Sequence, residues 1–179
     1  MFVTTTALDF VHVFRRDEPR LAMALAIARE CKWAKAILHA YVVMPHHIHL
    51  VVTLHENMNV QQFMKILKRE SSRSVRTLLA EEELARFSQQ TGLNRNTFWQ
   101  RSFRSIEIIG EKMFWSKVDY VHWNPVRAGL AERPEEYVCS SARLYEEGRW
   151  SEDVGLADAV AQSLRTGVTR LCKTEMCES

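Results

Sequence analysis

Residues 41–54 constrain the fold more than any other stretch, because they carry the pattern of a β-hairpin. Residues 41–44 are apolar or aromatic, a proline-containing turn follows, and residues 48–54 resume as a second strand. Successive side chains of a strand point to opposite faces, so His47 and His49 share one face, about 7 Å apart. Two imidazoles placed in this way can bind one divalent ion, or they can be ordinary surface histidines on a half-exposed strand.

The composition is that of a globular protein of one compact domain. The chain has 179 residues, 46% of them hydrophobic and 26% charged, and a net charge of only +2. A surface for nucleic acid must therefore come from local clusters of Lys and Arg. The four cysteines form no Cys-x-x-Cys pair, which argues against a zinc ribbon or a disulfide framework and predicts a reducing, cytoplasmic location. The apolar run at residues 21–28 is too short to span a bilayer, and nothing before it resembles a signal peptide, so we expect no membrane partner.

Hydrophobic periodicity predicts an α+β fold. The expected elements are strands at 3–14, 36–44, 48–54 and the end of 98–109, and helices at 21–33, 60–80 (capped by Asn59) and 111–123. This order, β-α-β-β-α-β followed by a helix, is the ferredoxin-like or RRM-like arrangement, in which two helices cover one face of a four-stranded antiparallel sheet. The histidine pair then lies on the open face, where the last helix can act as a catalytic helix. We expect one domain over residues 1–149 and an extension of helix and tail over 150–179.

Basic residues gather on one side of the predicted helix at 60–80. They are Lys65, Lys68, Arg69, Arg73 and Arg76. Such a run can be a solvated helix face, or it can bind an anionic partner. In residues 98–104 arginines alternate with aromatic residues, a pattern that suits base stacking and phosphate binding but equally suits the beginning of a strand.

Tyr120 and Asn124 lie one turn apart on the predicted catalytic helix. We place Asn124 at the helix end, because a residue before proline avoids the α region. If this helix packs on the open face, Asn124 can complete a site of two histidines and one amide for a metal ion. Tyr120 would then attack a phosphodiester polarised by that ion, forming a covalent phosphotyrosine and releasing a sugar hydroxyl. The alternative for Tyr120 is a packing role at the sheet edge.

Two motifs carry a family resemblance. His47-Ile48-His49, preceded by Tyr41-Val42-Val43-Met44-Pro45, resembles the histidine-hydrophobe-histidine motif of single-tyrosine HUH transposases. The segment from Tyr120 to Leu130 resembles the tyrosine segment of the REP-associated branch, and the likeness extends over roughly residues 5 to 145. Insertion-sequence relatives carry glutamine four residues after the tyrosine, where this chain has Asn124. Where Asp or Asn commonly precedes the first motif histidine, this chain has His46.

The resemblance implies a metal-dependent endonuclease and strand transferase that acts on single-stranded or hairpin DNA of the REP-like kind. It implies a 5′-phosphotyrosine intermediate on Tyr120, a Mg²⁺ or Mn²⁺ ion bound by His47, His49 and Asn124, and a monomer or homodimer. We expect DNA contacts from Lys65, Lys68, Arg69, Arg73, Arg101, Arg104 and Arg127. Two rival interpretations remain: a module that binds structured nucleic acid without cutting it, and a metal phosphoesterase that uses activated water and does not need Tyr120.

Overall fold

The structure is a computed structural model that describes residues 1–79, 81, 84–85, 98–150, 155–160 and 162. The polar residues 81–97 predict a loop with some helix; most of this segment and most of the expected tail lie outside the described part.

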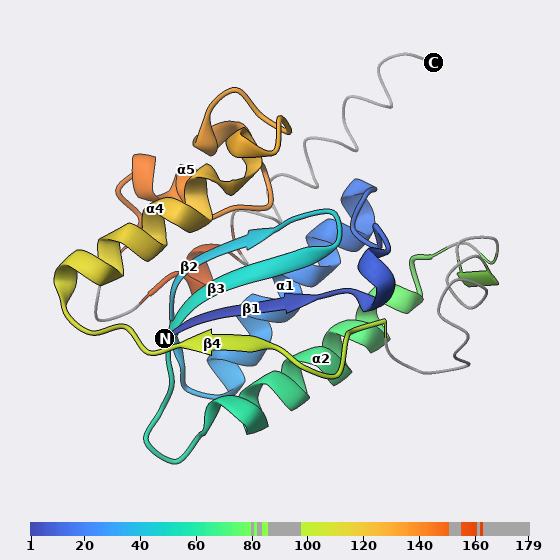
Figure 1. Ribbon diagram of the computed structural model, residues 1–179, viewed down its shortest axis with the longest axis horizontal. Helices are drawn as coiled ribbons and strands as arrows, with labels where there is room; N and C mark the ends of the chain where they lie inside the picture. Colours follow the sequence, from blue (N-terminus) through green and yellow to red (C-terminus); the bar gives the residue numbers. More distant parts are fainter. Residues whose placement is uncertain (80, 82–83, 86–97, 151–154, 161, 163–179) are drawn as a thin grey trace.

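A four-stranded antiparallel sheet forms the centre of the molecule (Figure 1). Its strands are β1 (Phe2–Thr6), β2 (Ile37–Val43), β3 (His47–Thr53) and β4 (Arg104–Ile106), in the spatial order β2-β3-β1-β4. All the pairings are antiparallel. The predicted α+β class and its β-α-β-β-α-β order are therefore confirmed.

Helices α1 (Asp17–Trp33) and α2 (Val60–Arg76) pack together across one face of the sheet (Figure 1). Between them and the sheet lies an apolar core. Helix α2 begins as predicted: the Asn59 side chain accepts a hydrogen bond from the backbone N–H of Gln62 at 2.9 Å, and the Gln62 side chain accepts one from Asn59 N–H at 3.2 Å. This capping box fixes the helix register and thereby the direction of its basic side.

Helix α4 (Glu111–Arg127) lies on the opposite face, over β2 and β3 (Figure 1). It runs four residues further than predicted, because the chain continues in helical form through Pro125. This proline stands in the last turn, where it removes only one intrahelical hydrogen bond, and its ring is buried. Asn124 therefore lies inside the helix rather than at its end, in regular register with Tyr120.

The segment after α4 protects the outer edge of β2. A short 3-10 helix η2 (Pro134–Glu136) and helix α5 (Ala142–Glu146) follow α4. Between them, the N–H of Val43 donates to the carbonyl of Cys139 at 2.9 Å, and the N–H of Ser141 donates to the carbonyl of Tyr41 at 3.0 Å. These bonds pair β2 on its outer side and fix the segment against the sheet.

The first strand is shorter than the predicted span of 3–14. β1 ends at Thr6, and the chain turns into the short 3-10 helix η1 (Leu8–Phe10). Asp9 and Phe10 adopt left-handed backbone angles, with φ of 50° and 57°. The apolar residues that predicted a longer strand have different roles: Phe14 enters the core, whereas Phe10 remains 63% exposed.

Residues 155–160 pack against the main body of the protein. Leu156 and Val160 are fully buried, and the N–H of Leu156 donates to the carbonyl of Leu38 at 2.8 Å. The division of the chain at residue 149 stays a prediction. No helix in the described residues is long and apolar enough to cross a bilayer.

Candidate active site

His47 and His49 lie side by side on the sheet face that α1 and α2 leave free. Their ring centroids are 4.7 Å apart. On the neighbouring strand β1, Thr6 pairs with His47 and Thr4 pairs with His49. Side chains of directly paired residues point to the same face of a sheet, so both threonines stand next to the histidine pair.

Both imidazoles are suited to bind a metal ion. Burial, with a smaller contribution from neighbouring His46, lowers the pKa of His47 to about 4. Burial, followed by the effect of His47, lowers the pKa of His49 to about 3. Both rings are therefore neutral at pH 7, the form in which histidine is a ligand.

The ring nitrogens of both histidines also suit metal binding. Nδ1 of His49 shares a hydrogen bond of 2.7 Å with the hydroxyl of Thr4, which leaves Nε2 of the ring for another partner. Nδ1 of His47 is buried and has no hydrogen-bond partner in the described part of the chain. A buried polar atom without a partner is costly, and a bound cation would satisfy it.

Tyr120 lies directly against His49. Its ring centroid is 5.3 Å from that of His49 and 5.7 Å from that of Phe2, which itself stacks on His49 at 5.4 Å. The guanidinium of Arg127 lies 5.7 Å from the centre of the Tyr120 ring. Tyr120 is 38% exposed. It is thus held by packing yet open to a large substrate.

Asn124 follows Tyr120 by one helical turn and is partly buried. Within the described residues, no three His, Cys, Asp or Glu side chains are grouped to hold a metal ion. A cation bound by the histidine pair therefore needs a ligand of another kind. The amide of Asn124, on the helix that carries Tyr120, is a suitable one.

A positively charged hollow of about 520 Å³ opens beside Tyr120 on the outer side of α4. Lys112, Lys117 and Arg127 contribute its cations. The ammonium of Lys117 also lies 5.2 Å from the centre of the Phe2 ring. An anionic group that reaches Tyr120 thus meets three cationic side chains and one carboxylate, that of Asp119.

The predicted DNA contacts divide into two groups. Five of them line a groove of about 660 Å³ between α2 and the segment that leads into β4: Lys65, Lys68, Arg69, Arg73 and Arg101. The other two lie at the histidine–tyrosine site: Arg127 against Tyr120, and Arg104 as the cross-strand partner of Thr4. The structure therefore presents a basic groove and, on the sheet, a separate cluster of two histidines and Tyr120.

Lys68 has a structural task that the sequence did not reveal. Its ammonium donates hydrogen bonds to the carbonyls of Gln100, Arg101 and Ser102, at 2.9, 3.3 and 2.9 Å. Burial lowers its pKa to about 8. Lys68 therefore fixes the segment before β4 and forms the floor of the groove.

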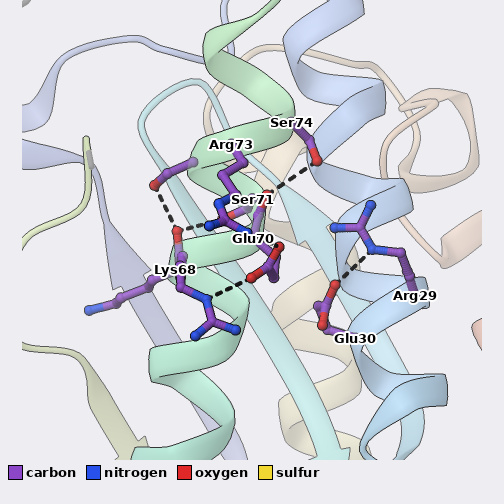
Figure 2. A network of polar contacts seen from close by, with 9 residues as sticks. Arg29, Glu30, Lys68, Glu70, Ser71, Arg73 and Ser74 are labelled. Atoms are coloured by element: carbon purple, nitrogen blue, oxygen red, sulfur yellow. Dashed lines mark hydrogen bonds and ion pairs between the residues drawn. The ribbon is translucent and has the colours of Figure 1, made fainter. Parts of the chain in front are cut away.

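Glu70 organises the two arginines at the groove. It forms ion pairs with Arg69 at 2.6 Å and with Arg73 at 3.6 Å, while Glu30 and Arg29 form a separate pair on α1 (Figure 2). The pairs of Glu70 involve exposed arginines and contribute little to stability, but they hold both guanidinium groups on one side of α2. Trp99, in contrast, is 3% exposed and donates to the hydroxyl of Ser71 at 3.0 Å, so most of its ring belongs to the core beneath the groove wall.

Sequence reasoning missed Phe2, Thr4 and Phe10 as neighbours of the site. For Thr4 a signal exists, because the alternation that places His47 and His49 on one face does the same for Thr4 and Thr6 once the strands are paired. The same alternation places Phe2, two residues before Thr4, on that face. Phe10 carries no such signal, since its position depends on the left-handed turn.

Comparisons with known proteins identify the family of this chain. The sequence pattern of the family described as IS200-like transposases matches residues 11–123 of this chain. This match covers more than half of the chain, and the protein therefore belongs to that family.

One related sequence and one solved structure are similar to this chain. Over 116 residues the chain is 30% identical to a Haemophilus influenzae protein named as a candidate REP-associated tyrosine transposase, covering 60% of this chain and 63% of that protein. The chain thus matches less than two thirds of that relative's length. The fold is similar to the solved structure of a REP-associated tyrosine transposase bound to a REP hairpin, with a TM-score of 0.59, 21% identity, and coverage of 86% of this chain and 85% of the other. The predicted resemblance is confirmed.

Proposed function

We propose that this protein is a metal-dependent endonuclease and strand transferase that cuts single-stranded DNA at or near a hairpin through a 5′-phosphotyrosine intermediate. The observation that carries the proposal is the contact of Tyr120 with His49, which is itself in ring contact with His47. A module that only binds DNA has no need of a partly exposed tyrosine held against one of two adjacent neutral histidines.

Tyr120 is the nucleophile in this proposal. Its phenolic oxygen attacks the phosphorus of the scissile phosphodiester and loses its proton to solvent. The bond from phosphorus to the 3′ oxygen breaks, and that oxygen takes up a proton to become a free 3′-hydroxyl. The 5′-phosphate stays bonded to Tyr120, so a 3′-hydroxyl can later attack the phosphotyrosine and rejoin a strand.

His47, His49 and Asn124 would hold the divalent ion, Mg²⁺ or Mn²⁺. When bound, such an ion polarises the scissile phosphate and stabilises its added negative charge. Arg127 and Lys117 support the same charge from α4, and the Tyr120 ring is oriented by Phe2 and His49. These interactions place the phenol where an anionic phosphate is attracted.

We propose that the hairpin binds in the basic groove along α2. Its cations would contact backbone phosphates and give an affinity that falls with salt. Lys65, Arg69, Arg73 and Arg101 supply these contacts, whereas Arg104 and Arg127 belong to the cleavage centre. We propose that the unit which binds the hairpin is a monomer or homodimer working in the cytoplasm.

The test uses hairpins with single-stranded flanks, taken from the DNA that surrounds the gene and labelled at either end. With Mn²⁺ or Mg²⁺ present, the proposal predicts a covalent adduct on a denaturing gel that retains the 3′-end label and releases the 5′-end label. Cleavage without an adduct would favour the phosphoesterase, and binding without cleavage would favour the non-cutting module. An adduct that retains the 5′-end label would reverse the assigned polarity.

A further inference from the structure

A second cavity opens beside the histidine pair, where β1 and the segment leading into β4 separate. It has a volume of about 330 Å³ and is lined by the threonines 4–6 of β1, by Phe10, and by Gln100, Phe103 and Arg104 across from them. This volume is at the lower end of the range found for small-molecule sites. A planar ring of nucleobase size fits such a space.

The cavity shares its wall with the candidate active site. Thr4 lines the cavity and also shares the hydrogen bond with Nδ1 of His49. Thr6 lines it as well and is the cross-strand partner of His47. A group in the cavity therefore lies next to two residues of β1 that adjoin the histidine pair.

Phe10, in the wall of this cavity, is an exposed aromatic residue with an unfavourable backbone conformation. It is 63% exposed, and both it and Asp9 have positive φ angles, which cost non-glycine residues free energy. Its ring centroid lies 5.8 Å from that of His46, in the turn before His47. An exposed aromatic ring on a strained turn gives the fold little stability, whereas it offers a flat surface on which a base can stack.

The polar groups of the cavity suit the edge of a base. Gln100 and Arg104 carry the donors and acceptors that proteins use to bind base edges. Thr5, which also contributes to the wall, is 1% exposed, and its hydroxyl has no hydrogen-bond partner among the described residues. The lining thus combines a stacking surface with hydrogen-bonding groups.

We propose that this cavity holds one unpaired nucleobase, that of the nucleotide next to the scissile phosphate. Stacking on Phe10 would pull the base out of the strand and fix the phosphate beside Tyr120. The assignment of that nucleotide rests on the proposed function, because the scissile phosphate is placed by the histidine–tyrosine site.

The experiment measures the affinity for a series of hairpins in which each unpaired nucleotide in turn lacks its base. Tyr120→Phe serves as the background, so that binding is measured without cleavage. One abasic position next to the cleaved bond should weaken binding about tenfold, as expected for the loss of one base–aromatic stack. In the Phe10→Ala variant of the same background, that penalty should fall below about twofold, while the other positions keep theirs.

Trp33→Ala is the matched control, because Trp33 is 64% exposed and lies at the end of α1, outside the cavity lining. It should leave the whole series unchanged. Equal penalties at every position with and without Phe10 would overturn the nucleobase assignment, even if Tyr120 forms its adduct. A position-specific dependence on Phe10 with no adduct in the Tyr120 protein would support the cavity and refute the proposed cleavage. No binding of any hairpin would overturn both.

Discussion

The hydroxyl of Thr4 and Nδ1 of His49 share a hydrogen bond of 2.7 Å that joins β1 to the histidine motif on β3. This bond fixes the orientation of the imidazole and leaves Nε2 available. Metal-binding histidines commonly use their second ring nitrogen in this way, and loss of such a partner weakens metal binding.

We therefore expect Thr4→Val, which keeps the size but removes the hydroxyl, to weaken Mn²⁺ binding about 10- to 100-fold. Calorimetric titration of the metal without DNA measures this directly, and cleavage should recover at high Mn²⁺. Thr4→Ser, which keeps the hydroxyl, should bind metal much as the unchanged protein does. Equal metal affinity for the Val and Ser variants would show that the bond does not position His49.

Lys65 and Lys68 lie in the same groove, but replacing each by an uncharged residue should have a different effect. Lys68→Met deprives three backbone carbonyls of their donor, so the free energy of unfolding should fall by about 1–3 kcal/mol. Lys65→Met, at an exposed position, should leave stability within about 0.5 kcal/mol of the original. It should instead lower the slope of log K against log salt by somewhat under one unit.

Urea denaturation and binding at several salt concentrations distinguish the two lysines. A stable Lys68→Met protein with a reduced salt slope would mean that Lys68 serves DNA rather than the chain.

Sequence reasoning reached the features that depend on local periodicity. The common face of His47 and His49 follows from the two-residue repeat of a strand, and the cap at Asn59 from the preference for asparagine just before a helix. The predicted end of α4 was wrong. A residue before proline tends to avoid the helical conformation, but here the packing of the helix on the sheet outweighs that tendency. The task of Lys68 could not be predicted, since its partners lie more than 30 residues away.

Buried neutral histidines should make stability depend on pH. Burial lowers the pKa of both His39 and His122 to about 4, and the His122 ring shares a 2.8 Å hydrogen bond with the hydroxyl of Ser141. Between pH 6.5 and about 4 the unfolded chain takes up protons that the folded chain does not. The free energy of unfolding should thus fall as pH falls, by up to about 1.4 kcal/mol per pH unit for each such histidine.

Replacing His122 by Gln keeps a polar group against Ser141. The fall in the free energy of unfolding with pH should then become smaller by the contribution of one histidine. Urea denaturation at pH 7 and pH 5 gives the comparison, with His55→Gln, at an exposed histidine, as the control. An unchanged pH dependence in His122→Gln would refute the assignment.

Gly155 allows the chain to pass close to β2 just before Leu156 enters the core. It has φ of +66°, and an added Cβ would lie 2.8 Å from both the side chain of Ile37 and the carbonyl of Leu38. Gly148 has a similar φ of +65° but nothing within 4 Å of the added atom. Gly155→Ala should therefore destabilise the protein by about 1–3 kcal/mol more than Gly148→Ala. Equal midpoints in thermal unfolding would show that residues 155–160 do not pack on β2 as described.

The central claim is that the Tyr120 oxygen forms the bond to DNA. Tyr120→Phe removes only that oxygen, so the variant should bind the hairpin with unchanged affinity and form no covalent adduct. Tyr145→Phe is the matched control: its phenol donates to the carbonyl of His39 at 2.9 Å, so its loss should cost stability but leave the adduct intact. The decisive measurement is mass spectrometry of the digested adduct. The account predicts a nucleotide bonded to the peptide that contains Tyr120, whereas an adduct at wild-type level in Tyr120→Phe, or one on another peptide, would contradict it.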